Sequence, residues 1–345
     1  MISGVSMRCM ISWTGGLAMV LLIAGCHEGN QGPWIKISGY TQGTTYNITY
    51  QDPDSTDYQE QVDALLADFD QSLSNYVPTS IVSRMNRGMP GVKADEYFRH
   101  CFQGAAEVYE ATDGAFDITV APIVNAWGFG FTERAKVDSA LIDSLLQFVG
   151  MDKVSLRGDT LVREKEGIML DMNAIAQGYS VDVVSEFFEA RGLRNYLVEI
   201  GGEVRTSGKN RFGLDWRIGV DKPIDGLQLP GVQMQAIIQI SGKSLATSGN
   251  YRRFYVEGGI KYSHTIDPST GYPVQHGLLS ATVVAGDCMR ADAYATAFMV
   301  MGYEKARSFL EKHKYLDAYL IFNDQSGEYR VWYTEGMSAM LSEEF

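Results

Sequence analysis

The spacing of apolar residues along the chain predicts both helices and strands. Between residues 57 and 73, apolar side chains recur every three or four positions, which is the period of an amphipathic helix. Residues 34–50 instead alternate apolar and polar positions around two glycines, and this pattern predicts two strands or a hairpin. By the same criteria, further helices are expected over residues 95–112, 138–149, 173–190, 290–301 and 303–313.

Short apolar runs bounded by turn residues predict many strands, most of them in the second half of the chain. They are expected over residues 153–157, 160–164, 195–200, 203–207, 215–220, 232–241, 253–257, 260–264, 279–285, 317–322 and 328–333. Because the helices and strands do not alternate regularly, the sequence favours an α+β fold over a doubly wound parallel sheet. Residues 34–345 contain no linker-like stretch and no repeat of fixed period, and we expect them to form one domain.

The first 26 residues have the pattern of an export signal. After Arg8, an uncharged apolar stretch runs from Cys9 to Gly25, and its most apolar part is short for a membrane span. Cys26 follows at once, and the small residues before it resemble the lipobox of bacterial lipoproteins. An ordinary signal peptide cleaved near Ala24, or an uncleaved anchor, is the alternative.

The lipobox resemblance implies a signal peptide over residues 1–25 and a lipid on Cys26, which becomes the mature N-terminus. Residues 26–33 would then form a polar tether between the lipid and the domain. The protein is accordingly expected in a bacterial cell envelope, anchored by lipid to a membrane, most simply the inner one, and facing the periplasm.

The composition narrows the class of protein. Of the 345 residues, 45% are apolar and 21% are charged, as in ordinary globular proteins. The 29 Lys and Arg against 42 Asp and Glu give a net charge of −13, so nucleic acid is not an expected partner. Cys101 and Cys288 lie among apolar residues and are expected to be buried free thiols, with a disulfide between them as the alternative.

Four segments carry more polar residues and glycines than packing alone requires. In residues 112–130, Asp117 stands among apolar residues and needs partners if it is buried, while Phe116 offers a flat apolar surface. In residues 170–182, Asp171 precedes a helix whose N-terminal amides suit a phosphate group. Core aromatics in a turn and simple helix capping are the plainer explanations of these two segments.

The other two segments place candidate catalytic groups close together. His264 stands three residues before Asp267, and an imidazole beside a carboxylate can act in proton transfer. On a helix, Asp292 and Thr296 are one turn apart, and their side-chain oxygens suit Mg²⁺. A simple hydrogen-bonded pair and an aspartate near a helix N-terminus are the plainer explanations. Since the chain has no G-x-G-x-x-G fingerprint and no complete P-loop, a nucleotide or flavin would have to be held in another way.

Together and in this order, these segments resemble the ApbE family, the FAD:protein FMN transferases. The resemblance spans residues 34–302 and is carried by DGAFDITVAP with WGFG, D-x-x-A-I-A-x-G-Y, EIGGEVRTSG, ATSGNYRR, SHTIDPSTGYPV and ADAYATA. It implies a single catalytic domain of mixed helices and antiparallel β-sheet. It also implies a Mg²⁺-dependent enzyme that attaches FMN from FAD to a Thr or Ser of a partner protein through a phosphoester bond, with release of AMP.

The same resemblance implies roles for individual residues. Mg²⁺ would be held by Asp292, Thr296 and the backbone carbonyl of Ala174. His264 would assist the transfer, oriented by Asp267. The positions that would hold FAD are Gln42, Tyr76, Ala115, Phe116, Asp117, Asp171, Gln177, Ser263 and Thr265. Two of them depart from the family pattern, which often has Met in place of Gln42 and Lys in place of Gln177.

The acceptor protein is expected to be a membrane redox subunit, in keeping with an anchor that faces the periplasm. Two other functions fit the same motifs. A FAD pyrophosphatase would pass the same group to water, and a flavin-binding lipoprotein would hold FAD without catalysis. A purely structural lipoprotein is a weaker alternative.

Overall fold

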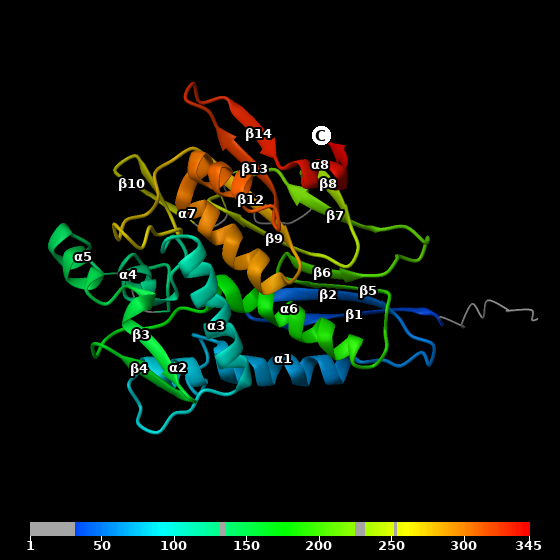
Figure 1. Ribbon diagram of the computed structural model, residues 1–345, viewed down its shortest axis with the longest axis horizontal. Coiled ribbons are helices and arrows are strands. Elements are labelled where there is room, and N and C mark those ends of the chain that lie inside the picture. Colours follow the sequence, from blue (N-terminus) through cyan, green and yellow to red (C-terminus); the bar gives the residue numbers. More distant parts are fainter. Residues whose placement is uncertain (1–31, 132–134, 225–231, 252–253) are drawn as a thin grey trace, which may run out of the picture. The chain divides into compact units, whose positions relative to one another are not determined.

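An eight-stranded antiparallel sheet forms the centre of the computed structural model, which describes residues 32–131, 135–224, 232–251 and 254–345 (Figure 1). Its strands are β1 (Trp34–Thr41), β2 (Thr44–Gln51), β5 (Tyr196–Ile200), β6 (Glu203–Ser207), β9 (Ser244–Gly249), β12 (Leu278–Ala285), β13 (Asp317–Asn323) and β14 (Tyr329–Tyr333). The order across the sheet is β1-β2-β5-β6-β9-β12-β13-β14, and each neighbouring pair is antiparallel. The predicted signal peptide and Cys26 lie outside the described residues.

Three smaller sheets accompany the large one. One has the order β15-β8-β7 and consists of β7 (Trp216–Asp221), β8 (Met234–Ile240) and β15 (Leu341–Glu344). The other two are the hairpins β3 (Val154–Arg157) with β4 (Thr160–Arg163) and β10 (Phe254–Glu257) with β11 (Ile260–Ser263). The helices are α1 (Gln59–Leu73), α2 (Ile81–Asn86), α3 (Glu96–Ala111), α4 (Ala121–Ala126), α5 (Ser139–Leu146), α6 (Asn173–Glu189), α7 (Cys288–Lys312) and α8 (Glu335–Met340).

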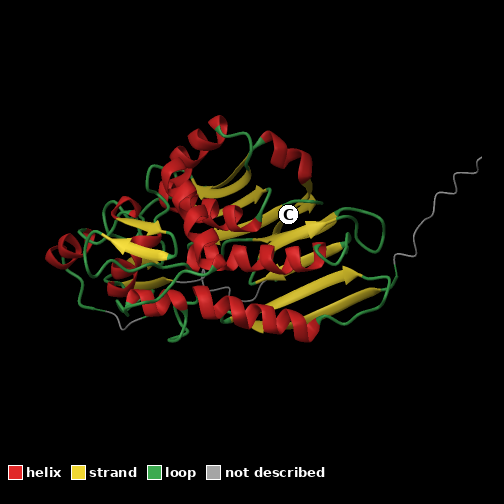
Figure 2. Ribbon diagram, turned by 60° about the horizontal axis from the view of Figure 1, so that its bottom comes forward, coloured by secondary structure: helices red, strands yellow, loops and turns green. Residues whose placement is uncertain are grey.

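Alternate residues of the central strands face two separate hydrophobic cores. On β9, Leu245 packs in the core shared with the three-stranded sheet, and Ala246 packs in the core shared with the helices. Val284 and Val283 on β12 divide in the same way. Since successive side chains of a strand point to opposite faces, these strands are buried on both sides. The long helices α1, α6 and α7 cover one face of the sheet (Figure 2).

The α+β fold and the antiparallel sheet predicted from the sequence are confirmed. The predicted break between two C-terminal helices is also confirmed, because the backbone of α7 leaves helical geometry at Gly302, where φ is +74°. Cys101 and Cys288 are buried free thiols, as expected, and burial raises the pKa of both.

The structure also contains elements that the sequence pattern did not reveal. The most important is β9, which occupies the middle of the large sheet although its sequence SLATSG is rich in small and polar residues. Pairing with β12 decides its conformation, and the Thr247 and Thr282 hydroxyls form a cross-strand hydrogen bond of 2.9 Å. The short elements α2, α4, α8 and β15 were missed as well, since four to six residues hold too little of any period.

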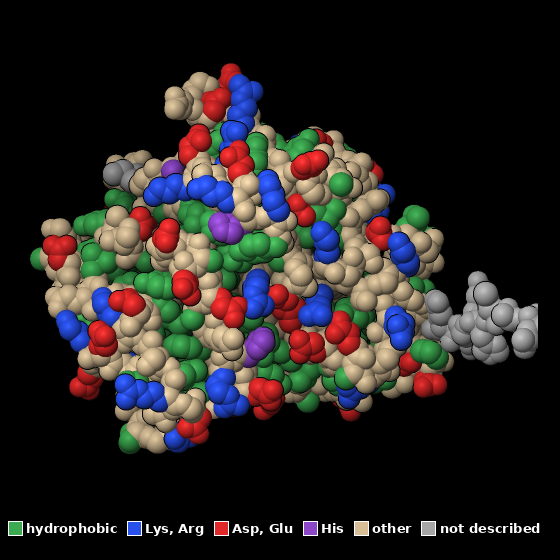
Figure 3. All heavy atoms as spheres, viewed as in Figure 1, with side chains coloured by type: hydrophobic (Ala, Val, Ile, Leu, Met, Phe, Trp, Pro, Cys, Tyr) green, Lys and Arg blue, Asp and Glu red, His purple; other side chains and the backbone are tan. Residues whose placement is uncertain are grey.

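The surface offers no continuous positive face in the view of Figure 3, because Lys and Arg side chains are interspersed there with Asp and Glu. Within the described residues, no helix has both the length and the apolar character needed to cross a bilayer.

Helices α6 and α7 are in close contact at Gly178. A Cβ atom on this residue would lie 2.3 Å from the carbonyl oxygen of Cys288 and 2.7 Å from Cβ of Asp292. Both contacts are far inside van der Waals distance, and the first is with backbone, which cannot swing aside. Glycine at this position therefore sets the distance between the two helices.

We predict that Gly178→Ala destabilises the protein by about 2 kcal/mol through overpacking, although alanine normally favours a helix. Chemical denaturation monitored by circular dichroism measures this. The matched control is Gly104→Ala on α3, whose new Cβ would lie 2.6 Å from the flexible end of Met289 and at an ordinary 3.8 Å from Cδ1 of Ile175. That variant should lose less than about 1 kcal/mol. Equal losses for the two variants would show that the α6–α7 distance is not constrained at Gly178.

Candidate active site

A cavity of about 720 Å³ brings together most of the residues singled out in the sequence. The predicted site residues that line it are Gln42, Tyr76, Ala115, Phe116, Asp117, Asp171, Ala174, Gln177, His264, Thr265, Asp292 and Thr296. Ser263 and Asp267 are not among the lining residues. The cavity thus joins segments as distant in the chain as Gln42 and Thr296.

Two asparagines hold the segment that leads into α6. Asn75 donates to the Leu170 carbonyl at 2.8 Å and accepts from the Met172 amide at 2.9 Å. Asn86 makes two further bonds of 2.8 Å, with the amide and the carbonyl of Leu170. These contacts place Asp171 at the cavity wall, where its Oδ1 accepts from the Asn173 amide at 2.9 Å. The role of the two asparagines is not visible in the sequence, because a side chain that binds distant backbone has no local sequence pattern.

The first turn of α6 is distorted where it meets α7. Ala174 lies outside helical geometry, with φ −91° and ψ 15°. The amide of Gly178, which in a regular helix donates to the carbonyl four residues earlier, donates to Oδ2 of Asp292 at 3.1 Å. A carbonyl at such a break can accept or coordinate a group from outside the helix. One turn further along α7, Oγ1 of Thr296 lies 3.2 Å from Oγ of Ser248.

A second buried carboxylate faces the same part of the cavity. Glu203, on β6, lines the cavity with Asp292, and its carboxylate accepts a hydrogen bond from Gln177. Burial raises the pKa of Asp292 to about 7. Burial, together with repulsion from Asp292, raises the pKa of Glu203 well above its ordinary value. Glu203 lies in the block EIGGEVRTSG, but in the sequence it resembles an ordinary strand residue, and its place in the site was not predicted.

Asp117 is buried, as its apolar surroundings suggested, and it has partners. Its Oδ1 accepts from the amide and the hydroxyl of Thr119 at 2.7 and 2.6 Å. The same hydroxyl oxygen accepts from the Gly150 amide at 2.7 Å. Burial raises the pKa of Asp117 to about 6, against the opposing effect of these hydrogen bonds. Next to it, Phe116 is buried at the cavity wall.

His264 follows the last residue of β11 and lines the cavity. Its ring lies edge-on to that of Phe129, with 6.5 Å between the ring centroids. Asp267 belongs to the following turn instead. Its Oδ1 accepts from the amide and the hydroxyl of Ser269 at 2.9 and 2.6 Å, and its carbonyl accepts from the Gly271 amide. The predicted part of Asp267 in orienting His264 stays a prediction.

All but one of the remaining predicted FAD positions line the cavity. Gln42 occupies the β1–β2 turn with φ +52°, and its Oε1 accepts from the Ser180 hydroxyl at 3.3 Å. Tyr76 is exposed at the rim. Thr265 is buried and donates to Oδ1 of Asn250 at 2.9 Å. Ser263 is buried and does not line the cavity.

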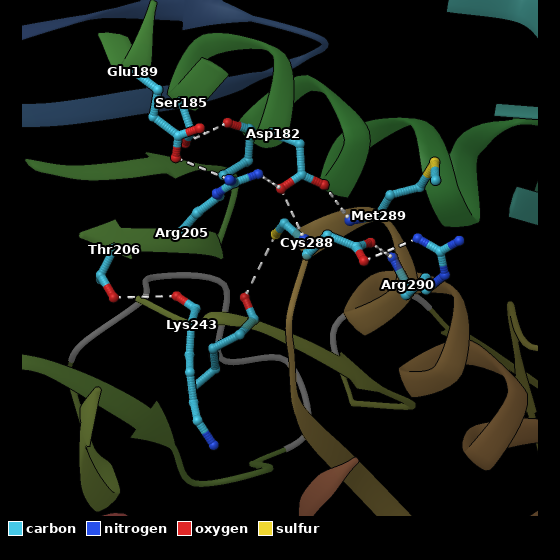
Figure 4. Close-up of polar contacts among 12 residues, drawn as sticks. Asp182, Ser185, Glu189, Arg205, Thr206, Lys243, Cys288, Met289 and Arg290 are labelled. Carbon is cyan, nitrogen blue, oxygen red and sulfur yellow. Dashed lines mark hydrogen bonds and ion pairs between the residues drawn. The ribbon is translucent and has the colours of Figure 1, made fainter. Parts of the chain in front are cut away.

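Asp182 fixes the start of α7 against α6 and so determines where Asp292 lies (Figure 4). Its two carboxylate oxygens accept from the amides of Cys288 and Met289 at 2.9 and 2.8 Å, and Oδ1 also pairs with Arg205 at 2.9 Å. Asp182 is one turn beyond Gly178 on the same face of α6. The helices are therefore held together by hydrogen bonds at one turn and by close contact at the next.

Among the described residues, no group of three or more His, Cys, Asp or Glu side chains could hold a metal ion. The set implied for Mg²⁺ is of another kind, since it contains one carboxylate, one hydroxyl and one backbone carbonyl. All three of its residues line the cavity. The chemistry of the donors fits the ion, because hydroxyl, carbonyl and carboxylate oxygens are the ligands that Mg²⁺ prefers.

Comparison with known proteins gives the class to which this fold and cavity belong. A FAD:protein FMN transferase of Vibrio cholerae is 38% identical over 319 residues, 88% of this chain and 92% of the relative. The corresponding protein of Haemophilus influenzae is 35% identical over 335 residues, 93% of this chain and 95% of the relative. Both are named as flavin-transferring enzymes.

Solved structures agree with the sequence comparison. The flavin transferase ApbE from Vibrio cholerae superimposes with a TM-score of 0.80 at 33% identity, over 90% of this chain and 99% of that one. The apo form of Pseudomonas stutzeri flavinyl transferase ApbE has a TM-score of 0.77 at 30% identity, with the same coverage. The ApbE family itself matches residues 42–320. The chain belongs to the ApbE family.

We predict that Asp182→Ala destabilises the protein by about 3 kcal/mol or more, because it leaves two helix amides without their acceptor and removes one of the two carboxylates paired with Arg205. Urea denaturation measures the change. The control is Asp215→Ala, which removes an exposed ion pair of 2.8 Å with Lys209 and should cost less than about 1 kcal/mol. If the two variants were equally stable, Asp182 would not be what holds α7 in place.

Proposed function

We propose that this protein is a Mg²⁺-dependent FAD:protein FMN transferase that modifies a Thr or Ser hydroxyl of a partner protein and releases AMP. The observation that carries the proposal is the single cavity in which Asp292, Thr296, Ala174 and His264 meet the other predicted flavin-binding positions. Family membership indicates the reaction class. The cavity contains groups suited to three requirements of that reaction: binding a cation, accepting a proton and binding FAD.

The first requirement is to hold a divalent cation at the pyrophosphate. Asp292, Thr296 and the carbonyl of Ala174 would hold Mg²⁺, which when bound neutralises charge on the pyrophosphate oxygens. Burial makes Asp292 and Glu203 costly to ionise, and Asp292 also repels the Glu203 carboxylate. A cation beside them relieves that cost. The distorted turn at Ala174 supports the same assignment, since it brings a backbone carbonyl to the cavity wall.

The second requirement is to accept the proton of the attacking hydroxyl. In the proposed reaction, the hydroxyl oxygen bonds to the FMN-side phosphorus, the bond from that phosphorus to the bridging oxygen breaks, and AMP leaves. His264 would accept the hydroxyl proton, because it is the cavity-lining imidazole of the block SHTIDPSTGYPV. Asp267 would act through the turn that follows His264.

The third requirement is to bind the two halves of FAD. Phe116, Phe129 and Tyr76 give the cavity flat apolar surfaces on which ring systems can lie. The N-terminal turn of α6 gives amides and a positive dipole end for the phosphates. Gln42, Asp117, Asp171 and the other predicted FAD positions then supply the polar contacts that set orientation.

We also propose that the protein is a lipoprotein, anchored through Cys26 to the inner membrane and facing the periplasm. The support is the lipobox-like end of the apolar N-terminal stretch. The acceptor would accordingly be a membrane redox subunit that presents a Thr or Ser on the same side.

We predict that Asp292→Asn abolishes Mg²⁺-dependent transfer. The amide oxygen can still accept from Gly178, so the fold is kept, while the charge needed for the cation is lost. In-gel flavin fluorescence of an acceptor protein, with and without Mg²⁺, measures transfer. Chelation of Mg²⁺ should stop the unaltered enzyme as well. Transfer at the normal rate by the variant would overturn the metal assignment, and AMP release without flavin on the acceptor would identify a pyrophosphatase.

We predict that His264→Ala slows transfer about 100-fold or more and changes FAD affinity far less, because the imidazole handles a proton. Single-turnover transfer and fluorescence titration of FAD measure the two effects. The control is His313→Ala, which removes a histidine that stacks on Phe309 and does not line the cavity. Equal losses in rate and affinity for His264→Ala would make His264 a binding residue.

A further inference from the structure

The loop between β6 and β7 exposes large apolar side chains in a fixed conformation. Phe212 is 71% exposed and Leu214 is 58% exposed. The side chain of Asn210 holds the loop, since its Oδ1 accepts from the Phe212 amide at 2.9 Å and its Nδ2 donates to the Asp215 carbonyl at 2.8 Å. A loop held in this way presents its apolar residues instead of folding them inward.

This loop lies close to the point where the described chain begins. A series of hydrogen bonds connects them: the Lys209 amide to Oδ1 of Asn195 at 2.8 Å, Nδ2 of Asn195 to Oε1 of Gln51 at 2.9 Å, and Nε2 of Gln51 to the Gly32 carbonyl at 2.9 Å. Directly after the loop, the ring of Trp216 lies edge-on to that of Trp34, with 5.7 Å between the ring centroids.

The number of residues before Gly32 limits how far the loop can be from an anchor. Six peptide steps separate Cys26 from Gly32, and a fully extended chain of that length spans at most about 21 Å. If Cys26 carries a lipid, Gly32 therefore stays within that distance of the bilayer surface. The surface around Gly32, which includes the loop, is then within reach of the lipid.

The side chains of the loop suit the boundary between water and lipid. The guanidinium of Arg211 lies over the Phe212 ring, 4.7 Å from its centroid, and within the described part of the chain no carboxylate forms an ion pair with it. An aromatic ring with a basic group above it can enter the headgroup region while the charge stays hydrated. Lys209 is paired with Asp215 at 2.8 Å, so the loop carries a net charge of about +1 in a chain of net −13.

We propose that Phe212 and Leu214 insert into the interface of the lipid bilayer and give the anchored domain a defined orientation. The proposal rests on the lipid anchor at Cys26. The turn at the same end of the domain contains Asp54 and Asp57, which are repelled by an anionic surface. Insertion therefore depends on the apolar side chains more than on charge, and it should occur on zwitterionic as well as anionic lipid.

The test is a fluorescence measurement on the full chain in vesicles of phosphatidylethanolamine and phosphatidylglycerol. A polarity-sensitive dye is attached to Leu214→Cys in one variant and to Val256→Cys in another, because Val256 has a similar exposure of 62%. Val256 lies on β10, at the left of Figure 1, whereas β1 begins at the right. Cys101 and Cys288 are buried and should not react, and the parent protein provides the background.

We expect nitroxide-bearing lipids to lower the fluorescence at position 214 by about twofold or more and to leave position 256 unchanged. Equal responses at the two positions, or quenching at 214 only after an acceptor protein is added, would overturn the proposal. Mass spectrometry of Cys26 tests the anchor separately. If Cys26 carries no lipid and added vesicles still quench the dye at position 214, the proposed insertion of the loop is supported and the proposed anchor is wrong. If Cys26 carries no lipid and no quenching occurs, the proposed insertion and the proposed anchor are both wrong. Both labelled variants should retain flavin transfer, since neither position lines the cavity.

Discussion

The close approach of α6 and α7 is the constraint on which the rest of the site depends. Gly178 allows the two helices to touch, and its amide binds the carboxylate of Asp292 directly. One turn along α6, Asp182 binds the first amides of α7, so the same face of one helix controls both the distance and the register of the other. Few sequences satisfy both conditions, because one needs the absence of a side chain and the other needs a buried charge.

The buried charges of the site have an energetic cost that packing elsewhere must offset. Asp292, Glu203 and Asp117 are all buried, and burial raises the pKa of each. Asp117 recovers part of this cost through Thr119, whereas Asp292 and Glu203 line the cavity, and Asp292 repels Glu203. Such an arrangement is typical of a functional site, where stability is lost so that a charged ligand can be bound. The double-sided cores of β9 and β12 supply the stability around it.

Local periodicity was sufficient for the long elements and insufficient for the short ones. The amphipathic pattern of α1 and the glycine break in α7 were both visible in the sequence, since each depends on residues within one or two helical turns. The strand β9 was not visible, because its six residues adopt extended geometry through pairing with strands more than thirty positions away. The same limit explains Asn75 and Asn86, which act on Leu170 across about 90 residues.

The sequence by itself determined the α+β class, the main helices, and, through family resemblance, many of the residues that line one cavity. It did not determine which residues form the cavity wall. Asp267 was predicted for the site but belongs to a turn, whereas Glu203 was not predicted and lines the cavity. Only the tertiary structure decided this, because orientation depends on contacts between elements that are distant in the chain. Tertiary structure also decided the place of the loop with Phe212 and Leu214. The sequence shows that these residues are apolar, but the connection of their loop to Gly32 depends on the pairing of β6, β5 and β2.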